Sequence, residues 1–134
     1  MKKKMTKKMA AFGMVMTMLF SMALVANAET TLRASDNVKG ATVALSHTYS
    51  IANIKSVGSM SGYVKDSHIS DTLAVTYKNN TTGKYYSTNK IGSGYSAVEV
   101  NYTRPSGNYT ITSSRSDFSY RNNGSATRTK SIGA

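Results

Sequence analysis

The chain has 134 residues and no cysteine, and its 17 basic and 6 acidic residues give a formal net charge of +11. The lack of cysteine excludes disulfide bonds, thiolate nucleophiles and cysteine-ligated metal centres. Five of the basic residues lie at positions 2–8, so the chain after residue 28 has a net charge of +6.

Residues 1–28 have the three parts of a secretory signal peptide. The five lysines precede an uncharged apolar run from Met9 to about Ala26, which ends in the small-x-small motif Ala26-Asn27-Ala28. Because this run is at the lower limit of the roughly 20 apolar residues that span a membrane, an uncleaved anchor is the alternative. The cleavage motif favours removal after Ala28. We therefore expect a secreted protein of a Gram-positive bacterium, without stable membrane insertion after cleavage.

Residues 29–40 show little periodicity, and they are predicted to be a mobile lead-in. The folded domain is then expected to span residues 41–134. From Val43 onward, apolar and polar residues alternate in several short runs, and this period of two is typical of strands. The apolar members of these runs are the predicted core: Val43, Leu45, Ile51, Leu73, Val75, Val98, Val100, Ile111 and Phe118.

Clusters of turn-forming residues separate these runs. Residues 79–83 predict a hairpin loop, residues 105–108 a connection, and Asn123-Gly124 a tight turn, since both residues tolerate positive φ. The glycine-rich segments 58–62 and 92–94 are predicted as looser connections. Seven or eight short strands about ten residues apart predict an all-β fold, a single small antiparallel β-sandwich, with a small barrel as the alternative.

The two histidines are the first candidates for chemistry. His47 falls on the apolar side of a predicted strand, so we expect a buried, hydrogen-bonded core residue. His68 lies between Asp66 and Asp71, which could supply oxygen ligands to a divalent ion, and a polar loop is the alternative. Since no further ligand follows at a recognisable spacing, no metal or other cofactor is predicted.

Catalytic motifs are not found in the sequence. There is no Gly-x-Ser-x-Gly elbow and no phosphate-binding glycine loop. A Ser/His/Asp triad could assemble in space, but no local pattern supports one. The carboxylates that a glycosidase pair would need are Asp66, Asp71, Glu99 and Asp117, and none has a context that indicates a raised pKa. No catalytic residue is predicted.

Basic residues are concentrated in the last 31 residues, which carry a net charge of +4, and six of the nine tyrosines lie in the same half of residues 29–134. Cations set among aromatic rings bind polyanions and stack on flat ligands, including sugars. The predicted ligand contacts are Tyr109, Arg115, Tyr120, Arg121, Arg128 and Lys130. The alternative is a solvated face that protects a sheet edge. An exported protein meets wall polymers and the anionic envelope surface, so these are the expected partners, and nucleic acid is not.

Residues 71–100 (DTLAVTYKNNTTGKYYSTNKIGSGYSAVEV) resemble part of the lactococcin 972-type bacteriocins. The matching features are a Val-containing strand, the turn at 79–83, a polar Lys-containing strand and the small-residue strand after Gly94. That family is exported, lacks cysteine and folds as a small β-sandwich, although its members are shorter and carry Trp. The resemblance implies an activity against wall synthesis.

The sequence thus predicts a secreted, non-catalytic β-sandwich that binds at the bacterial cell envelope or its anionic polymers. A bacteriocin-like protein that acts on neighbouring Gram-positive cells is the first alternative. A small secreted enzyme is the second.

Overall fold

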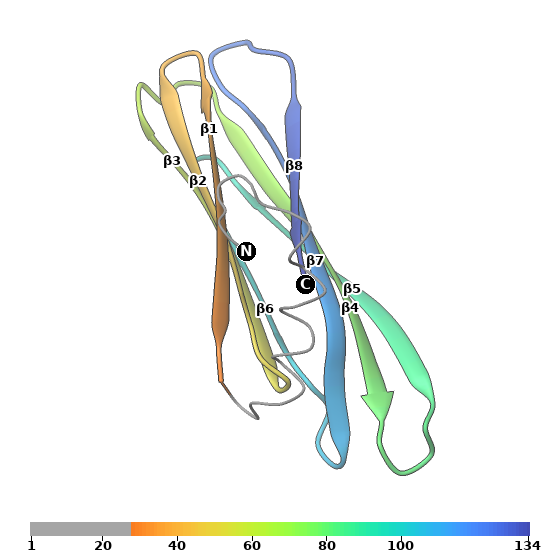
Figure 1. Ribbon diagram of the computed structural model, residues 1–134. Coiled ribbons are helices and arrows are strands. Elements are labelled where there is room, and N and C mark those ends of the chain that lie inside the picture. Colours follow the sequence, from red (N-terminus) through yellow and green to blue (C-terminus); the bar gives the residue numbers. More distant parts are fainter. Residues whose placement is uncertain (1–27) are drawn as a thin grey trace.

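The computed structural model describes residues 28–134, which form eight strands in two four-stranded sheets (Figure 1). The strands are β1 (Thr30–Val38), β2 (Ala41–Tyr49), β3 (Asn53–Gly62), β4 (His68–Asn79), β5 (Tyr85–Gly94), β6 (Ala97–Thr103), β7 (Tyr109–Arg121) and β8 (Arg128–Gly133). The prediction of a small antiparallel β-sandwich is confirmed. The predicted signal peptide lies outside the described residues, apart from Ala28.

The strand order is β1-β2-β3-β6 in one sheet, here called sheet A, and β5-β4-β7-β8 in the other, sheet B. Every neighbouring pair is antiparallel. The chain passes from sheet A to sheet B after β3, returns after β5 and crosses again after β6. In residues 28–134, no helix is long and apolar enough to cross a membrane.

The two sheets bury an apolar core between them, because alternate side chains of each strand point to the opposite sheet. Eight of the nine predicted core residues are buried, and Ile51 is partly buried against them. The core also contains two large tyrosines that the sequence did not single out for it, Tyr49 and Tyr120.

The prediction of a mobile lead-in at residues 29–40 is wrong. Residues Thr30–Val38 form β1, which pairs with β2 along its whole length, from Thr30 opposite Tyr49 to Val38 opposite Ala41. The alternation of this strand is weak because Ala34 and Asp36 occupy two of its inward positions. The folded domain therefore includes the segment that was expected to precede it.

The glycine-rich segments 58–62 and 92–94 lie inside β3 and β5 and are not connections. A Cβ on Gly58 would lie 2.8 Å from Ile69 Cδ1, and one on Gly92 would lie 2.8 Å from Val100 Cγ2. Both glycines therefore permit the two sheets to approach closely, which is the other common reason for glycine in a strand.

The other predicted turns are present. Residues 79–83 join β4 to β5, and the Gly83 N–H donates to the Asn79 carbonyl over 2.8 Å. Between β7 and β8, Asn123 and Gly124 have φ values of 48° and 73°. These values confirm the tight turn for which both residues were selected.

Candidate binding surface

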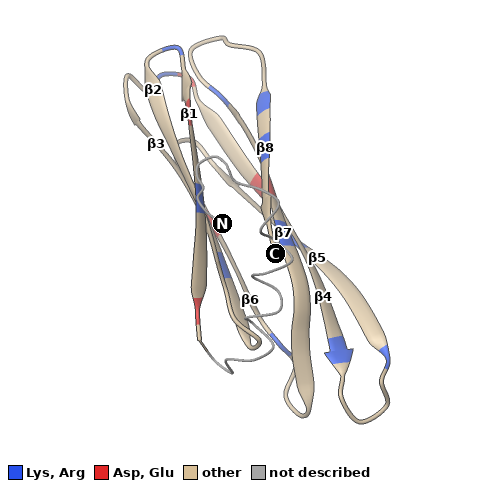
Figure 2. Ribbon diagram, in the orientation of Figure 1, with Lys and Arg blue, Asp and Glu red and all other residues tan. Residues whose placement is uncertain are grey.

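The six residues predicted to contact a ligand do not share one surface. Figure 2 shows Lys and Arg distributed over both sheets and both ends of the sandwich. On β7, Arg115 and Arg121 take outward positions, six residues and so about 20 Å apart. On β8, Arg128 and Lys130 pair with Tyr120 and Phe118, and therefore share their side of sheet B, toward sheet A.

Tyr120 and Arg128 hold the sandwich together at one edge. Tyr120 is 1% exposed, and its hydroxyl donates to Asp36 Oδ2 over 2.7 Å. Arg128 donates to both oxygens of Asp36, over 2.8 and 3.1 Å. Burial alone would raise the pKa of Asp36, but the hydrogen bonds from Tyr120 and Arg128 outweigh it and lower that pKa. Tyr120 is therefore a structural residue, and its prediction as a ligand contact is wrong.

Tyr109 lies at the opposite end of β7, in a group of four tyrosine rings. The Tyr77 ring stacks on Tyr86 at 5.4 Å, meets Tyr109 edge-on at 5.7 Å and is tilted against Tyr102 at 6.2 Å. These rings come from β4, β5, β6 and β7, so they close one end of the space between the two sheets. Such ring pairs contribute to stability beyond the area that they bury.

His47 is fully buried and hydrogen-bonded, as predicted. Its Nδ1 lies 2.7 Å from Ser116 Oγ, and its Nε2 lies 2.7 Å from Ser114 Oγ. Ser116 Oγ is in turn 2.7 Å from Ser56 Oγ on the other sheet. Burial lowers the pKa of His47 to about 4, so the imidazole is neutral at pH 7. The network thus connects β2 and β3 to β7 through neutral groups.

Asp71 is also fully buried, and neither of its carboxylate oxygens has a hydrogen-bond partner among the described residues. Burial raises the pKa of Asp71 to about 6. The Ser56 side chain opposes this rise, but its hydroxyl pairs with Ser116 and makes no regular hydrogen bond to the carboxylate. His47 and Asp71 therefore do not form the base-and-orienter pair of a triad. A substrate outside the protein does not reach these groups.

The candidate ligands near His68 are not brought together. His68 is exposed, whereas Asp71 points into the core, and Asp66 lies in the loop before β4. Within the part of the chain that the structure describes, no three His, Asp or Glu residues are placed to hold a metal ion.

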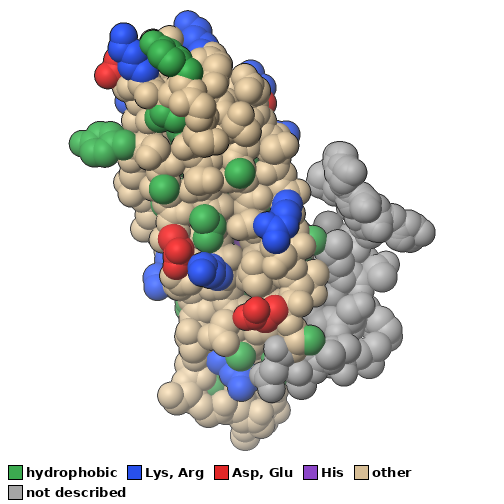
Figure 3. Space-filling view, turned by 90° about the vertical axis from the view of Figure 1, so that its left-hand side faces the viewer, with side chains coloured by type: hydrophobic (Ala, Val, Ile, Leu, Met, Phe, Trp, Pro, Cys, Tyr) green, Lys and Arg blue, Asp and Glu red, His purple; other side chains and the backbone are tan. Residues whose placement is uncertain are grey.

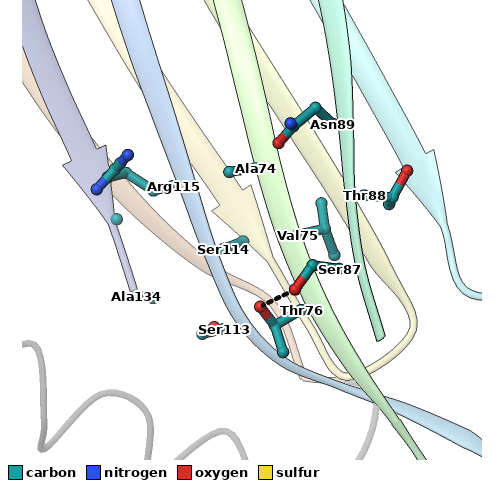
Figure 4. A pocket seen from close by; sticks show the side chains of 11 residues that line it. Ala74, Val75, Thr76, Ser87, Thr88, Asn89, Ser113, Ser114, Arg115 and Ala134 are labelled. Carbon is teal, nitrogen blue, oxygen red and sulfur yellow. Dashed lines mark hydrogen bonds between the residues drawn. The ribbon is translucent and has the colours of Figure 1, made fainter. Parts of the chain in front are cut away.

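A shallow groove of about 530 Å³ crosses the outer face of sheet B over β5, β4 and β7 (Figure 4). We call it the sheet B groove, and the side chains that give it its character are Ala74, Thr76, Ser87, Asn89, Ser113 and Arg115. Gly133 and Ala134 close it on the β8 side. The groove exists because four of these outward positions, on three adjacent strands, carry small side chains: Ala74, Thr76, Ser87 and Ser113.

The strand pairing orders the groove in rows. Asn89, Ala74 and Arg115 lie side by side across the strands, and Ser87 and Thr76 form the next row with hydroxyls 3.4 Å apart (Figure 4). Apart from Arg115, the polar side chains that line the groove are therefore uncharged hydroxyls and one amide.

Two large apolar side chains stand on either side of these rows. On the outward side of β5, Tyr85 precedes Ser87 and is 62% exposed, while Ile91 follows Asn89 and is 76% exposed. Lys78 Nζ lies 5.7 Å from the centre of the Tyr85 ring. Exposed apolar side chains beside a groove with a few polar groups are typical of an interaction site.

Figure 3 shows how side chains of different types are distributed over one face of the molecule. Uncharged polar groups cover most of the described face in this view, and charged side chains of both signs are scattered among them. Of the six predicted contacts, only Arg115 lines the groove. The sequence could not identify the other lining residues, since Ala, Ser and Thr at outward positions form no motif until the strand pairing is known.

The comparisons with known proteins found no related protein. No protein-family model matches the chain, and neither the curated proteins nor the solved structures include a match. The resemblance of residues 71–100 to the lactococcin 972-type bacteriocins therefore stays a prediction from the sequence.

Proposed function

We propose that this protein is secreted and binds, without catalysis, to the bacterial cell envelope through the sheet B groove. The observation that carries the proposal is the placement of two exposed apolar side chains, Tyr85 and Ile91, beside a groove lined by small apolar residues and uncharged polar side chains. A shallow, open groove suits a polymer that lies across it better than a small molecule that must be enclosed.

The distribution of charge favours this groove over a basic patch as the contact surface. Arg115 Nη2 lies 3.1 Å from Asp117 Oδ2, and Arg128 Nε lies 2.8 Å from Asp36 Oδ2. Two of the four predicted cationic contacts are therefore paired with acids. Dispersed and paired charges attract a polyanion weakly, and that attraction is screened by salt. We therefore expect envelope binding that depends on Tyr85 and Ile91 more than on the arginines.

The proposal of binding without catalysis rests on the position of the reactive groups. His47, its serine partners and Asp71 all lie in the core between the sheets. His47 and its serine partners are hydrogen-bonded to one another, and the Asp71 carboxylate has no hydrogen-bond partner among the described residues. All of these groups are buried, so a polymer on the outer face does not contact them.

The test is retention of the mature chain, residues 29–134, on isolated cell walls. Tyr85→Ser and Ile91→Ser should each weaken retention, because they remove apolar contact area next to the groove. Tyr63→Ser is the matched control, since Tyr63 is 54% exposed but lies after β3, away from the groove. Equal retention of all four proteins, or none by the wild type, would contradict the proposal.

The bacteriocin-like alternative is tested in the same series. The residues that resemble the lactococcin 972 type, 71–100, include all of β5 and most of β4, which form two of the three strands under the groove. Growth arrest of related bacteria by the wild-type protein, but not by Tyr85→Ser, would favour an antagonist that uses this groove. Retention on walls without growth arrest favours a binding protein.

A further inference from the structure

We infer that the ligand of the sheet B groove is an uncharged glycan whose sugar rings carry acetamido groups. This inference rests on the proposed function and specifies its ligand. It follows from the charge, the shape and the apolar borders of the groove.

The charge of the groove is nearly balanced. The Arg115 guanidinium is paired with Asp117, and Asp117 also accepts a hydrogen bond from the Ser131 hydroxyl over 2.5 Å. The remaining polar side chains that line the groove are hydroxyls and the Asn89 amide. Neutral donors and acceptors of this kind match the hydroxyl and amide groups of a sugar, and they offer little to a chain of phosphates.

The row that contains Ala74 fits an acetamido group. Ala74 forms a small apolar floor, with Asn89 on the strand to one side and Arg115 on the strand to the other. Neighbouring strands are about 4.8 Å apart, and Asn89 reaches from β5 toward Ala74, whereas the Arg115 guanidinium points toward β8 (Figure 4). The methyl group of the acetamide would pack on the Ala74 Cβ. Its carbonyl would accept a hydrogen bond from the Asn89 amide nitrogen, or its N–H would donate to the Asn89 amide oxygen.

The borders of the groove give the direction of the chain. Tyr85, Asn89 and Ile91 lie on the outward side of β5, and Tyr85 to Ile91 spans about 20 Å at the rise of an extended strand. The apolar face of a sugar ring can stack on the Tyr85 ring while the next rings pass over the polar rows. The Lys78 ammonium beside Tyr85 can donate to a sugar hydroxyl.

The experiment measures binding of residues 29–134 to three soluble probes by calorimetry, at low and at high salt. The probes are a β-linked N-acetylglucosamine oligomer, a glucose oligomer of the same linkage and length, and poly(glycerol phosphate). We expect the acetylated oligomer to bind roughly tenfold more tightly than the glucose oligomer, with little change on adding salt.

Ala74→Val tests the position of the acetamido group. Valine suits a strand but fills the floor of the groove, so binding of the acetylated oligomer should weaken roughly tenfold. Ala44→Val is the control, since Ala44 is exposed on β2 in sheet A. Unchanged binding by a folded Ala74→Val protein would overturn the assignment of the site.

The remaining outcomes separate this inference from the proposed function. If the acetylated oligomer binds no better than the glucose oligomer, or if only poly(glycerol phosphate) binds and salt abolishes it, the inference is wrong. Retention on walls without binding of any oligomer also overturns it, while the proposed function stands. Absence of wall retention by the wild-type protein overturns both.

Discussion

At the scale of single residues, the core contains two ionisable groups whose pKa values shift in opposite directions. Burial lowers the pKa of His47 to about 4 from 6.5, so its contribution to stability is present above pH 6.5 and lost as the pH falls toward 4. Burial raises the pKa of Asp71 to about 6 from 3.8, so its contribution is present below pH 3.8 and lost as the pH rises through 6. Between pH 4 and 6 the two effects oppose each other.

Asp71→Asn should expose the effect of His47. A pKa shift of about two units corresponds to about 3 kcal/mol, so the variant should lose about that much stability relative to the wild type between pH 7 and pH 4. The cost of burying an amide is the same at both pH values, so it cancels when the difference between variant and wild type at pH 4 is compared with that at pH 7. Urea unfolding of both proteins at both pH values measures these free energies. Parallel stability curves for the two proteins would contradict the assignment of Asp71.

The burial of some side chains could be predicted from the sequence, but their partners could not. His47 was predicted to be buried because it shares the apolar side of its strand with Leu45 and Tyr49, and local alternation is enough for that conclusion. The partners of His47 could not be predicted, since Ser114 and Ser116 are more than 60 residues away in the chain. Tyr120 was misassigned for the same reason: its partner Asp36 lies on β1.

At the scale of strands, glycine was the main source of error. Glycine marks a turn when it takes a positive φ, as Gly124 does, but it also marks a position where another sheet approaches. Periodicity does not distinguish these uses. The strand alternation through Gly58 shows the second one, because Ser56 and Met60 on either side of it point inward and are buried.

Gly58→Ala tests this interpretation of β3. The added methyl group would lie 2.8 Å from Ile69 Cδ1 and 3.1 Å from Phe118 Cε1, so we expect a loss of about 1–3 kcal/mol from overpacking. Ser61→Ala, at an exposed position of the same strand, should change stability by less than about 0.5 kcal/mol. Thermal unfolding of both variants measures the difference. A neutral or stabilising Gly58→Ala would show that the sheets do not pack closely at this position.

At the scale of the whole molecule, β1 decides whether one side of the sandwich is closed. It covers the edge of β2, places Val38 in the core and supplies Asp36 to Tyr120 and Arg128. The fold class was predictable because most strands alternate clearly. The extent of the domain was not, since an edge strand needs only a weak apolar side.

Deletion of residues 29–40 distinguishes a strand from a mobile lead-in. Loss of the buried Val38 side chain and the partly buried Leu32 side chain alone should cost on the order of 3 kcal/mol, and the Asp36 hydrogen bonds are lost as well. We expect a large drop in the urea midpoint or failure to fold. A truncated protein with the midpoint of the full mature chain would contradict the placement of β1.

The central claim is that the outer face of sheet B is the binding surface. The most direct test is a titration of isotope-labelled residues 29–134 with solubilised wall fragments, followed by amide chemical shifts in NMR spectra. We expect the largest shifts on the groove residues of β4, β5 and β7, with Tyr85 and Ile91 beside them. Shifts concentrated at Arg128 and Lys130, or on the outer face of sheet A, would contradict it.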